Sequence, residues 1–196
     1  MNTNTLPKLV QEEEQKLILQ GISWQEYLAL DSTLENVPGV RLSYLTGTLQ
    51  IMTLSPQHEA VKTTIGRLLE MYAFAKNIAL HGYGSTTYRR ELKASGLEPD
   101  ECYFIGEIKD VPDLAIEVVI TSGGINKLAI YQGLGVREVW FWESGNFSLY
   151  NLGENEYQSV SRSQFFPDLD LAVLSQYVQP FNQPQAVRDF YTAVCQ

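Results

Sequence analysis

The sequence contains little cysteine and no long apolar run. Its two cysteines, Cys102 and Cys195, lie far apart and follow no CxxC or Cys/His spacing, so neither a disulfide framework nor a zinc site is expected. No apolar segment approaches the roughly 20 residues that a membrane-spanning helix needs, and the N-terminus is polar and acidic. These absences predict a soluble, non-exported, cytoplasmic protein without a membrane partner.

Positive charge is also scarce. The chain carries 14 basic and 23 acidic residues, which gives a net charge of −9. Proteins that bind nucleic acid nonspecifically usually have a basic surface that replaces phosphate counterions, so this balance counts against such binding. It does not exclude a nuclease, because carboxylates at a metal site contribute to the deficit and a local basic groove is compatible with an acidic whole.

What the sequence does contain is typical of one globular domain. The chain has 196 residues, of which 44% are hydrophobic and 19% charged. This length suffices to bury a core without disulfides or structural metal. A single domain over residues 1–196 is therefore expected, with no internal repeat or linker.

The first half of the chain predicts helices around a β-hairpin. Ser23 to Glu26 has the spacing of a capping box and predicts a short helix after a loose start. Strands are expected at 41–45 and 48–52, joined through Thr46-Gly47. Ser55-Pro56 opens a helix whose apolar stripe recurs at helical spacing and consists of Val61, Ile65, Leu68, Leu69 and Tyr72.

The second half predicts a mixed sheet. Strands are expected at 82–92 and 98–105, broken by Ser95-Gly96, and then at 113–120, where the sequence is strongly apolar. A helix over about 125–134, stopped by Gly135, leads to a strand at 137–142, so these two strands should be parallel. The remaining expected elements are a hairpin of 146–152 with 157–161 and two helices from about 171 and 185.

Candidate chemistry lies on the strand from Asp113 to Ile120. Successive side chains of a strand point to opposite faces, so Glu117 shares a face with Asp113 and Val119, while the other face is apolar core. An unpaired buried charge costs several kcal/mol. Glu117 therefore needs a cation, a basic partner such as Arg89 or Arg90, or water.

Asp100 and Lys127 are placed to answer that need. Asp100 begins the preceding strand, which should run antiparallel or close to the Glu117 strand. Oxygen ligands without His or Cys favour a hard ion such as Mg²⁺ or Mn²⁺. Lys127, on the next helix, could position or deprotonate a water.

The order of these residues resembles a known family. Glu98-Pro99-Asp100 is followed by Pro112 to Val118, then by Lys127 and Tyr131, and then by Gly135 to Trp140. This succession is similar to the Uma-type bacterial family, a domain of unknown function described as restriction endonucleases of the PD-(D/E)xK superfamily. The resemblance covers roughly residues 23–177.

The resemblance implies a restriction-endonuclease-like α/β fold, in which helices flank a central mixed sheet and an N-terminal β-hairpin is added. It also implies that Asp100 and Glu117 bind the metal, with Asp113 as an optional third ligand. The usual lysine position of the superfamily is Val119 here, and Lys127 suits the relocation of that lysine to the following helix. An accessory metal-binding role falls to His58 or Glu59 on the first long helix.

Several structural roles remain open for these residues. Asp113 could merely cap a strand, Lys127 could be a solvated helix lysine, and His58 could be a packed or capping residue. Trp140 and Trp142 share a strand face that suits core or a dimer contact better than base stacking.

The hypothesis from sequence is a Mg²⁺- or Mn²⁺-dependent endonuclease that hydrolyses phosphodiester bonds of nucleic acid, with DNA as the first candidate. A catalytically silent module that acts through protein association, for example as a homodimer, is the main alternative. It is supported by Val119 in the lysine position and by the net charge. A hydrolase of small phosphodiesters or nucleotides is the third reading.

Overall fold

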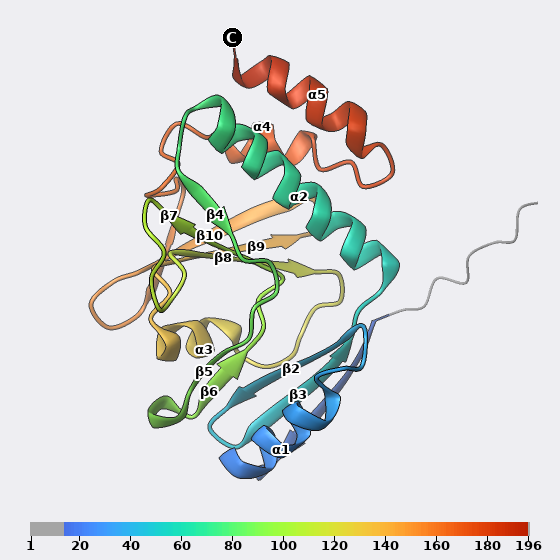
Figure 1. Cartoon of the computed structure of the whole chain (residues 1–196), viewed down its shortest axis with the longest axis vertical. Helices are drawn as coiled ribbons and strands as arrows, with labels where there is room; N and C mark the ends of the chain where they lie inside the picture. Colours follow the sequence, from blue (N-terminus) through green and yellow to red (C-terminus); the bar gives the residue numbers. More distant parts are fainter. Residues whose placement is uncertain (1–13, 196) are drawn as a thin grey trace, which may run out of the picture.

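The computed structural model describes residues 14–195 and arranges them around two β-sheets (Figure 1). The smaller sheet has five strands, and every neighbouring pair in it is antiparallel. Its strands, in spatial order, are β1 (Gln15–Gln20), β3 (Thr48–Thr53), β2 (Val40–Leu45), β6 (Ser95–Leu97) and β5 (Tyr88–Arg90).

The larger sheet has six strands and one parallel pair, β8 with β9. The helix α3 (Lys127–Leu134) connects that pair, as the strand–helix–strand order predicted. In spatial order its strands are β11 (Tyr157–Val160), β10 (Asn146–Leu152), β9 (Glu138–Glu143), β8 (Leu114–Val119), β7 (Glu101–Ile105) and β4 (Leu80–Gly82).

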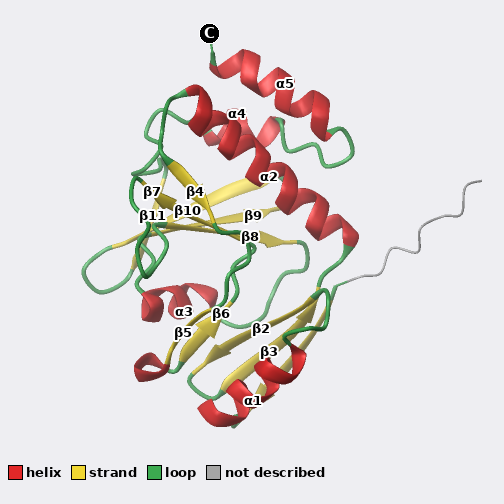
Figure 2. Cartoon of the chain, in the orientation of Figure 1, coloured by secondary structure: helices red, strands yellow, loops and turns green. Residues whose placement is uncertain are grey.

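Helices cover both faces of the six-stranded sheet (Figure 2). The long helix α2 (Pro56–Ala75) lies on one face, with α4 (Leu171–Gln176) and α5 (Gln183–Val194) beside it. The helix α3 covers the opposite face and lies between this sheet and the five-stranded one. The expected period-two pattern of β8 is confirmed, because Leu114, Ile116 and Val118 pack with α2 while Ala115 packs with α3.

The predicted helix starts are confirmed by their caps. Ser23 and Glu26 form the reciprocal capping box of α1 (Trp24–Leu34), and the hydroxyl of Ser55 accepts the backbone N–H of His58 at 3.1 Å. The helix α1 packs on the five-stranded sheet through Tyr27, whose ring stacks on that of Tyr44 at 4.8 Å between centroids.

The chain between 82 and 97 departs from expectation. The predicted strand at 82–92 is wrong, because the chain leaves the larger sheet at Gly82, turns through Gly84 at a φ of 53°, and enters the smaller sheet as β5. A short 3-10 helix, Glu91–Lys93, follows. Ser95-Gly96, expected to separate two strands, lies in β6, because Ser43 to Leu45 of β2 provide backbone partners for it.

The start of the described chain also differs from the sequence expectation. Residues 15–20 form the edge strand β1 and pair with β3 along its whole length. A largely exposed edge strand lacks a strict alternation of apolar and polar residues, so the sequence carried little signal for it. The predicted hairpin of β2 and β3 is therefore the centre of a larger sheet. Within residues 14–195, no helix is long and apolar enough to cross a membrane.

Candidate active site

Asp100 and Glu117 meet where β7 and β8 run side by side. The two strands are antiparallel with Glu101 opposite Ile116, which sets the preceding residue Asp100 beside Glu117. Oδ2 of Asp100 accepts the backbone N–H of Val118 at 2.7 Å, and this bond fixes the carboxylate against β8. Both carboxylates are buried. The expectation that the two strands are antiparallel neighbours is confirmed.

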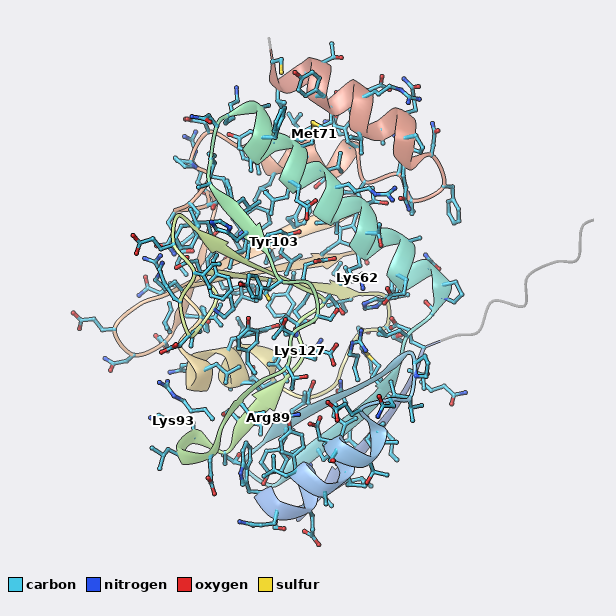
Figure 3. All side chains as sticks on the ribbon, viewed as in Figure 1. Lys62, Met71, Arg89, Lys93, Tyr103 and Lys127 are labelled. Atoms are coloured by element: carbon cyan, nitrogen blue, oxygen red, sulfur yellow. The ribbon has the colours of Figure 1, made fainter. Side chains whose placement is uncertain are left out.

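Lys127 and Tyr131 hold the carboxylate of Glu117. The ammonium of Lys127 donates to one oxygen, and the hydroxyl of Tyr131 donates to the other. The two donors stand four residues apart on α3 and so project from the same helix face. The side chain of Asn126 caps this helix by accepting the N–H of Ala129 at 3.1 Å. Figure 3 shows Lys127 between the ribbon of β8 and the five-stranded sheet.

The two carboxylates differ in acidity although both are buried. Burial raises the pKa of Glu117 to about 7, and the nearby charge of Asp100 adds to this rise, while Lys127 opposes it. Burial acts in the same direction on Asp100, but the contacts with His58 and the positive charge of Lys127 lower its pKa overall. The pKa of Lys127 is raised because Glu117 and Asp100 outweigh the effect of burial. Asp100 therefore stays ionised more readily than Glu117 does.

His58 lies between Asp100 and Glu14. Its Nδ1 is 2.5 Å from Oε1 of Glu14, and its Nε2 is 2.9 Å from Oδ1 of Asp100 but is not oriented for a good hydrogen bond. Burial lowers the pKa of His58, yet the two carboxylates outweigh burial and raise it to about 9. A protonated imidazole has no free lone pair for a metal. In this state His58 supports the negative charge of Asp100, and the accessory metal-binding role predicted for it stays a prediction.

Glu59 pairs with a lysine of its own helix. Its Oε2 lies 2.7 Å from Nζ of Lys62, one turn further along α2, and its side chain is partly exposed. The accessory role predicted for Glu59 finds no supporting contact among the described residues.

Asp113 directly precedes β8, at the end of the strand that is further from the site. Its Oδ1 accepts from Nζ of Lys109 at 2.7 Å and from Nε of Arg137 at 3.1 Å, and its Oδ2 accepts the backbone N–H of Ile105 at 2.9 Å. Four residues along a strand span about 13 Å, too far for one ion to bridge Asp113 and Glu117. The structure does not bring Asp113 to the site. The optional metal role predicted for Asp113 is therefore wrong, because its carboxylate pairs with the side chains of Lys109 and Arg137.

The two arginines that the sequence offered as partners of Glu117 contact other groups instead. Arg89 pairs with Asp31, and Arg90 donates to the backbone oxygen of Gly133 at 3.2 Å. Val119, at the usual lysine position, lines a cleft beside the site. Trp140 and Trp142 are buried in the core, which confirms the core position predicted for them.

A cleft of about 370 Å³ opens beside Lys127. Its lining comes from β1, β3, β8, β9 and β10, from the loop before α3 and from the first residues of α3. Lys16 ties β1 to this loop by donating to the backbone oxygen of Gly123 at 3.1 Å, and Oε1 of Gln50 accepts the N–H of Ile125 at 2.9 Å. Gly124 is required there, because its φ is +127° and a Cβ would collide with Gln50.

Sequence reasoning missed Glu14 and Gln50 as members of this region. Glu14 stands just before β1, the strand that the sequence did not reveal, and its Oε2 also accepts the hydroxyl of Thr121 at 2.8 Å. Gln50 belongs to a predicted strand, but a lone amide in a strand gives no sign of its partner. Of the further residues that contact the site, Tyr131 had a signal in the sequence, because it follows Lys127 at a helical spacing of four.

Comparison with known proteins identifies the family. Residues 24–181 match the family model Uma2, described as "Putative restriction endonuclease". The chain belongs to this family. The Uma2 match includes Asp100, Glu117, Lys127 and Tyr131, whereas Glu14 precedes it.

A solved structure supports the Uma2 fold. A crystal structure from Anabaena variabilis ATCC 29413, described as "a putative nuclease belonging to DUF820", matches with a TM-score of 0.55 and 16% sequence identity. The match covers 88% of this chain and 99% of the other. The predicted restriction-endonuclease-like α/β fold is thereby confirmed. No match was found among curated proteins.

Proposed function

We propose that this chain is a nuclease that hydrolyses phosphodiester bonds of nucleic acid, DNA in the first place, with the help of Mg²⁺ or Mn²⁺. The observation that carries the proposal is the meeting of Asp100 and Glu117 on neighbouring strands, with Lys127 against Glu117. The Uma2 description and that of the Anabaena structure support the same reaction class.

The donor set fits a hard divalent ion. Within residues 14–195 no three His, Cys, Asp or Glu side chains form a metal cluster, so the protein would offer two carboxylates, Asp100 and Glu117. Mg²⁺ is commonly bound in this way, through one or two carboxylates plus waters and substrate phosphate. Lys127 already pairs with Glu117, so a divalent ion would share this carboxylate with the lysine ammonium or replace it there. When bound, the ion would lower the pKa of a water and shield the phosphate charge.

The side chains around the carboxylates have separate tasks in this proposal. Lys127 orients the attacking water and stabilises the negative charge that develops on the phosphate. Tyr131 fixes the orientation of the Glu117 carboxylate through its hydroxyl. His58, protonated and close to Asp100, keeps that carboxylate ionised.

Cleavage of plasmid DNA in Mg²⁺ or Mn²⁺ tests the proposal. Asp100→Asn and Glu117→Gln keep the size of each side chain but remove its charge, and each should lower the nicking rate about a hundredfold or more. Asp113→Asn is the matched control, since it removes a buried carboxylate from the same strand, and it should cleave at the wild-type rate. Cleavage by Glu117→Gln at the wild-type rate would refute the proposal.

A further inference from the structure

The cleft beside Lys127 has the size of a small-molecule site. Its volume of about 370 Å³ falls at the low end of the range of such sites, roughly 300–1,000 Å³. Its charged lining residues balance, with Lys16 and Lys127 against Glu14 and Glu143. A duplex needs a long basic surface to follow both phosphate backbones, and neither this lining nor the net charge of −9 provides one.

Strand register connects the cleft directly to the site. Glu117 of β8 pairs with Phe141 of β9, and Phe141 pairs in turn with Ser148 of β10. Paired residues of neighbouring strands share a face of the sheet and lie about 4.8 Å apart across the strands. The ring of Phe141 is thus the immediate sheet neighbour of the Glu117 carboxylate, on the face that carries the cleft.

Two aromatic rings line this cleft. Phe141 and Tyr150 are partly exposed there, and their ring centroids lie 5.8 Å apart with an interplanar angle of 84°. Trp140 and Trp142, on either side of Phe141 in sequence, point to the opposite face and are buried. Ser148 and Glu143 add exposed polar groups at the same place. The cleft therefore combines aromatic faces with hydrogen-bonding groups.

We infer that this cleft binds one unpaired base of a single-stranded nucleic acid, with the base stacked against Phe141 or Tyr150 and its phosphate directed to Lys127, beside Glu117. The inference rests on the proposed nuclease function and specifies its substrate as a single strand. Base–aromatic stacking tolerates any sequence, because every base has a π-face. A paired base is already stacked inside its duplex, so the cleft selects for an unpaired base. A duplex enters only where a base is unstacked.

Binding of a short fluorescein-labelled oligothymidine, followed by anisotropy in EDTA so that metal-dependent cleavage is absent, tests the inference. Phe141→Leu and Tyr150→Leu keep apolar volume but remove the ring, and each should weaken binding about tenfold. Phe74→Leu, which removes an exposed ring from α2 outside the cleft, is the control and should bind as the wild type does. Thermal melting of each variant verifies that it is folded.

The outcomes separate this inference from the proposed function. Equal binding by Phe141→Leu, Tyr150→Leu and the wild type overturns the base site, and so does tighter binding of the matching duplex than of the single strand. If metal-dependent plasmid nicking persists in that case, the proposed nuclease stands without the base site. If the rings matter for binding but no nucleic acid is cleaved with Mg²⁺ or Mn²⁺, the nuclease proposal fails and the binding site stands.

Discussion

The two ends of β8 carry carboxylates of the same face in opposite circumstances. Asp113 is 2% exposed and Glu117 is 0% exposed. The partners of Asp113 are Lys109 and Arg137, whose side chains are 45% and 52% exposed, whereas Lys127, the partner of Glu117, is only 16% exposed. Burial alone therefore does not reveal which carboxylate is placed for chemistry. The two carboxylates differ instead in the exposure of their partners and in the cleft that opens beside Lys127.

The electrostatic result differs accordingly. Burial tends to raise the pKa of Asp113, but Lys109, the Ile105 N–H and Arg137 lower it overall. At the other end, burial prevails and raises the pKa of Glu117 to about 7 despite Lys127. A carboxylate that several solvent-facing cations surround stabilises the fold, while a buried carboxylate with a raised pKa is a candidate for a functional role.

Removing the lysine from each end should produce the largest difference in stability. Lys127→Met leaves Glu117 buried without its cation, and we expect a loss of about 3 kcal/mol in the free energy of unfolding. Lys109→Met leaves Arg137 on Asp113 and removes only an exposed partner, so its expected cost is below about 1 kcal/mol. Urea denaturation of both variants measures this difference.

A double variant completes the first comparison. Lys127→Met with Glu117→Gln removes both charges of the buried pair, so most of the loss caused by Lys127→Met alone should be recovered. If the double variant is as unstable as Lys127→Met, or if the two lysine variants lose equal stability, the two ends of β8 are not electrostatically different in the way argued above.

A smaller effect concerns the dependence of stability on pH. The pKa of Asp113 is lowered from 3.8 in the folded state, so its contribution is present above that pH and is lost as pH falls through the folded pKa. The pKa of Glu117 is raised from 4.5 to about 7, so the folded state binds more protons between these values and stability falls as pH rises through this window.

Substitution at each end should therefore flatten different parts of the stability curve. Asp113→Asn should reduce the loss of stability in acid below about pH 4, and Glu117→Gln should reduce the loss between about pH 4.5 and 7. Denaturant midpoints measured across this pH range, each subtracted from the wild-type value, give the two differences. If both variants differ from the wild type with the same pH dependence, Asp113 and Glu117 do not have the opposite pKa shifts argued above.

Much of the fold followed from sequence because it rests on local signals. Capping residues marked α1 and α2, glycine marked the turn between β2 and β3, and the apolar strand with its helix predicted the parallel pair of β8 and β9. The strands β1 and β6 did not follow, since a short or exposed strand is specified by its partners and not by its own pattern.

The site was predictable to the extent that one strand and one helix encode it. The period of β8 set Glu117 inward, and the order of motifs placed Asp100 and Lys127 near it, as the structure finds. The same period set Asp113 on that face but could not reveal that Lys109 and Arg137 hold it. Glu14 depends on β1, so its contact with His58 could not be foreseen.

Calorimetric titration with Mn²⁺ tests the central claim most directly, that the Glu117 end of β8 and not the Asp113 end is the metal site. Wild type and Asp113→Asn should bind the ion with equal affinity, whereas Glu117→Gln and Asp100→Asn should show no measurable binding. Loss of binding in Asp113→Asn together with unchanged binding in Glu117→Gln would contradict the account, as would a wild-type protein that does not bind Mn²⁺.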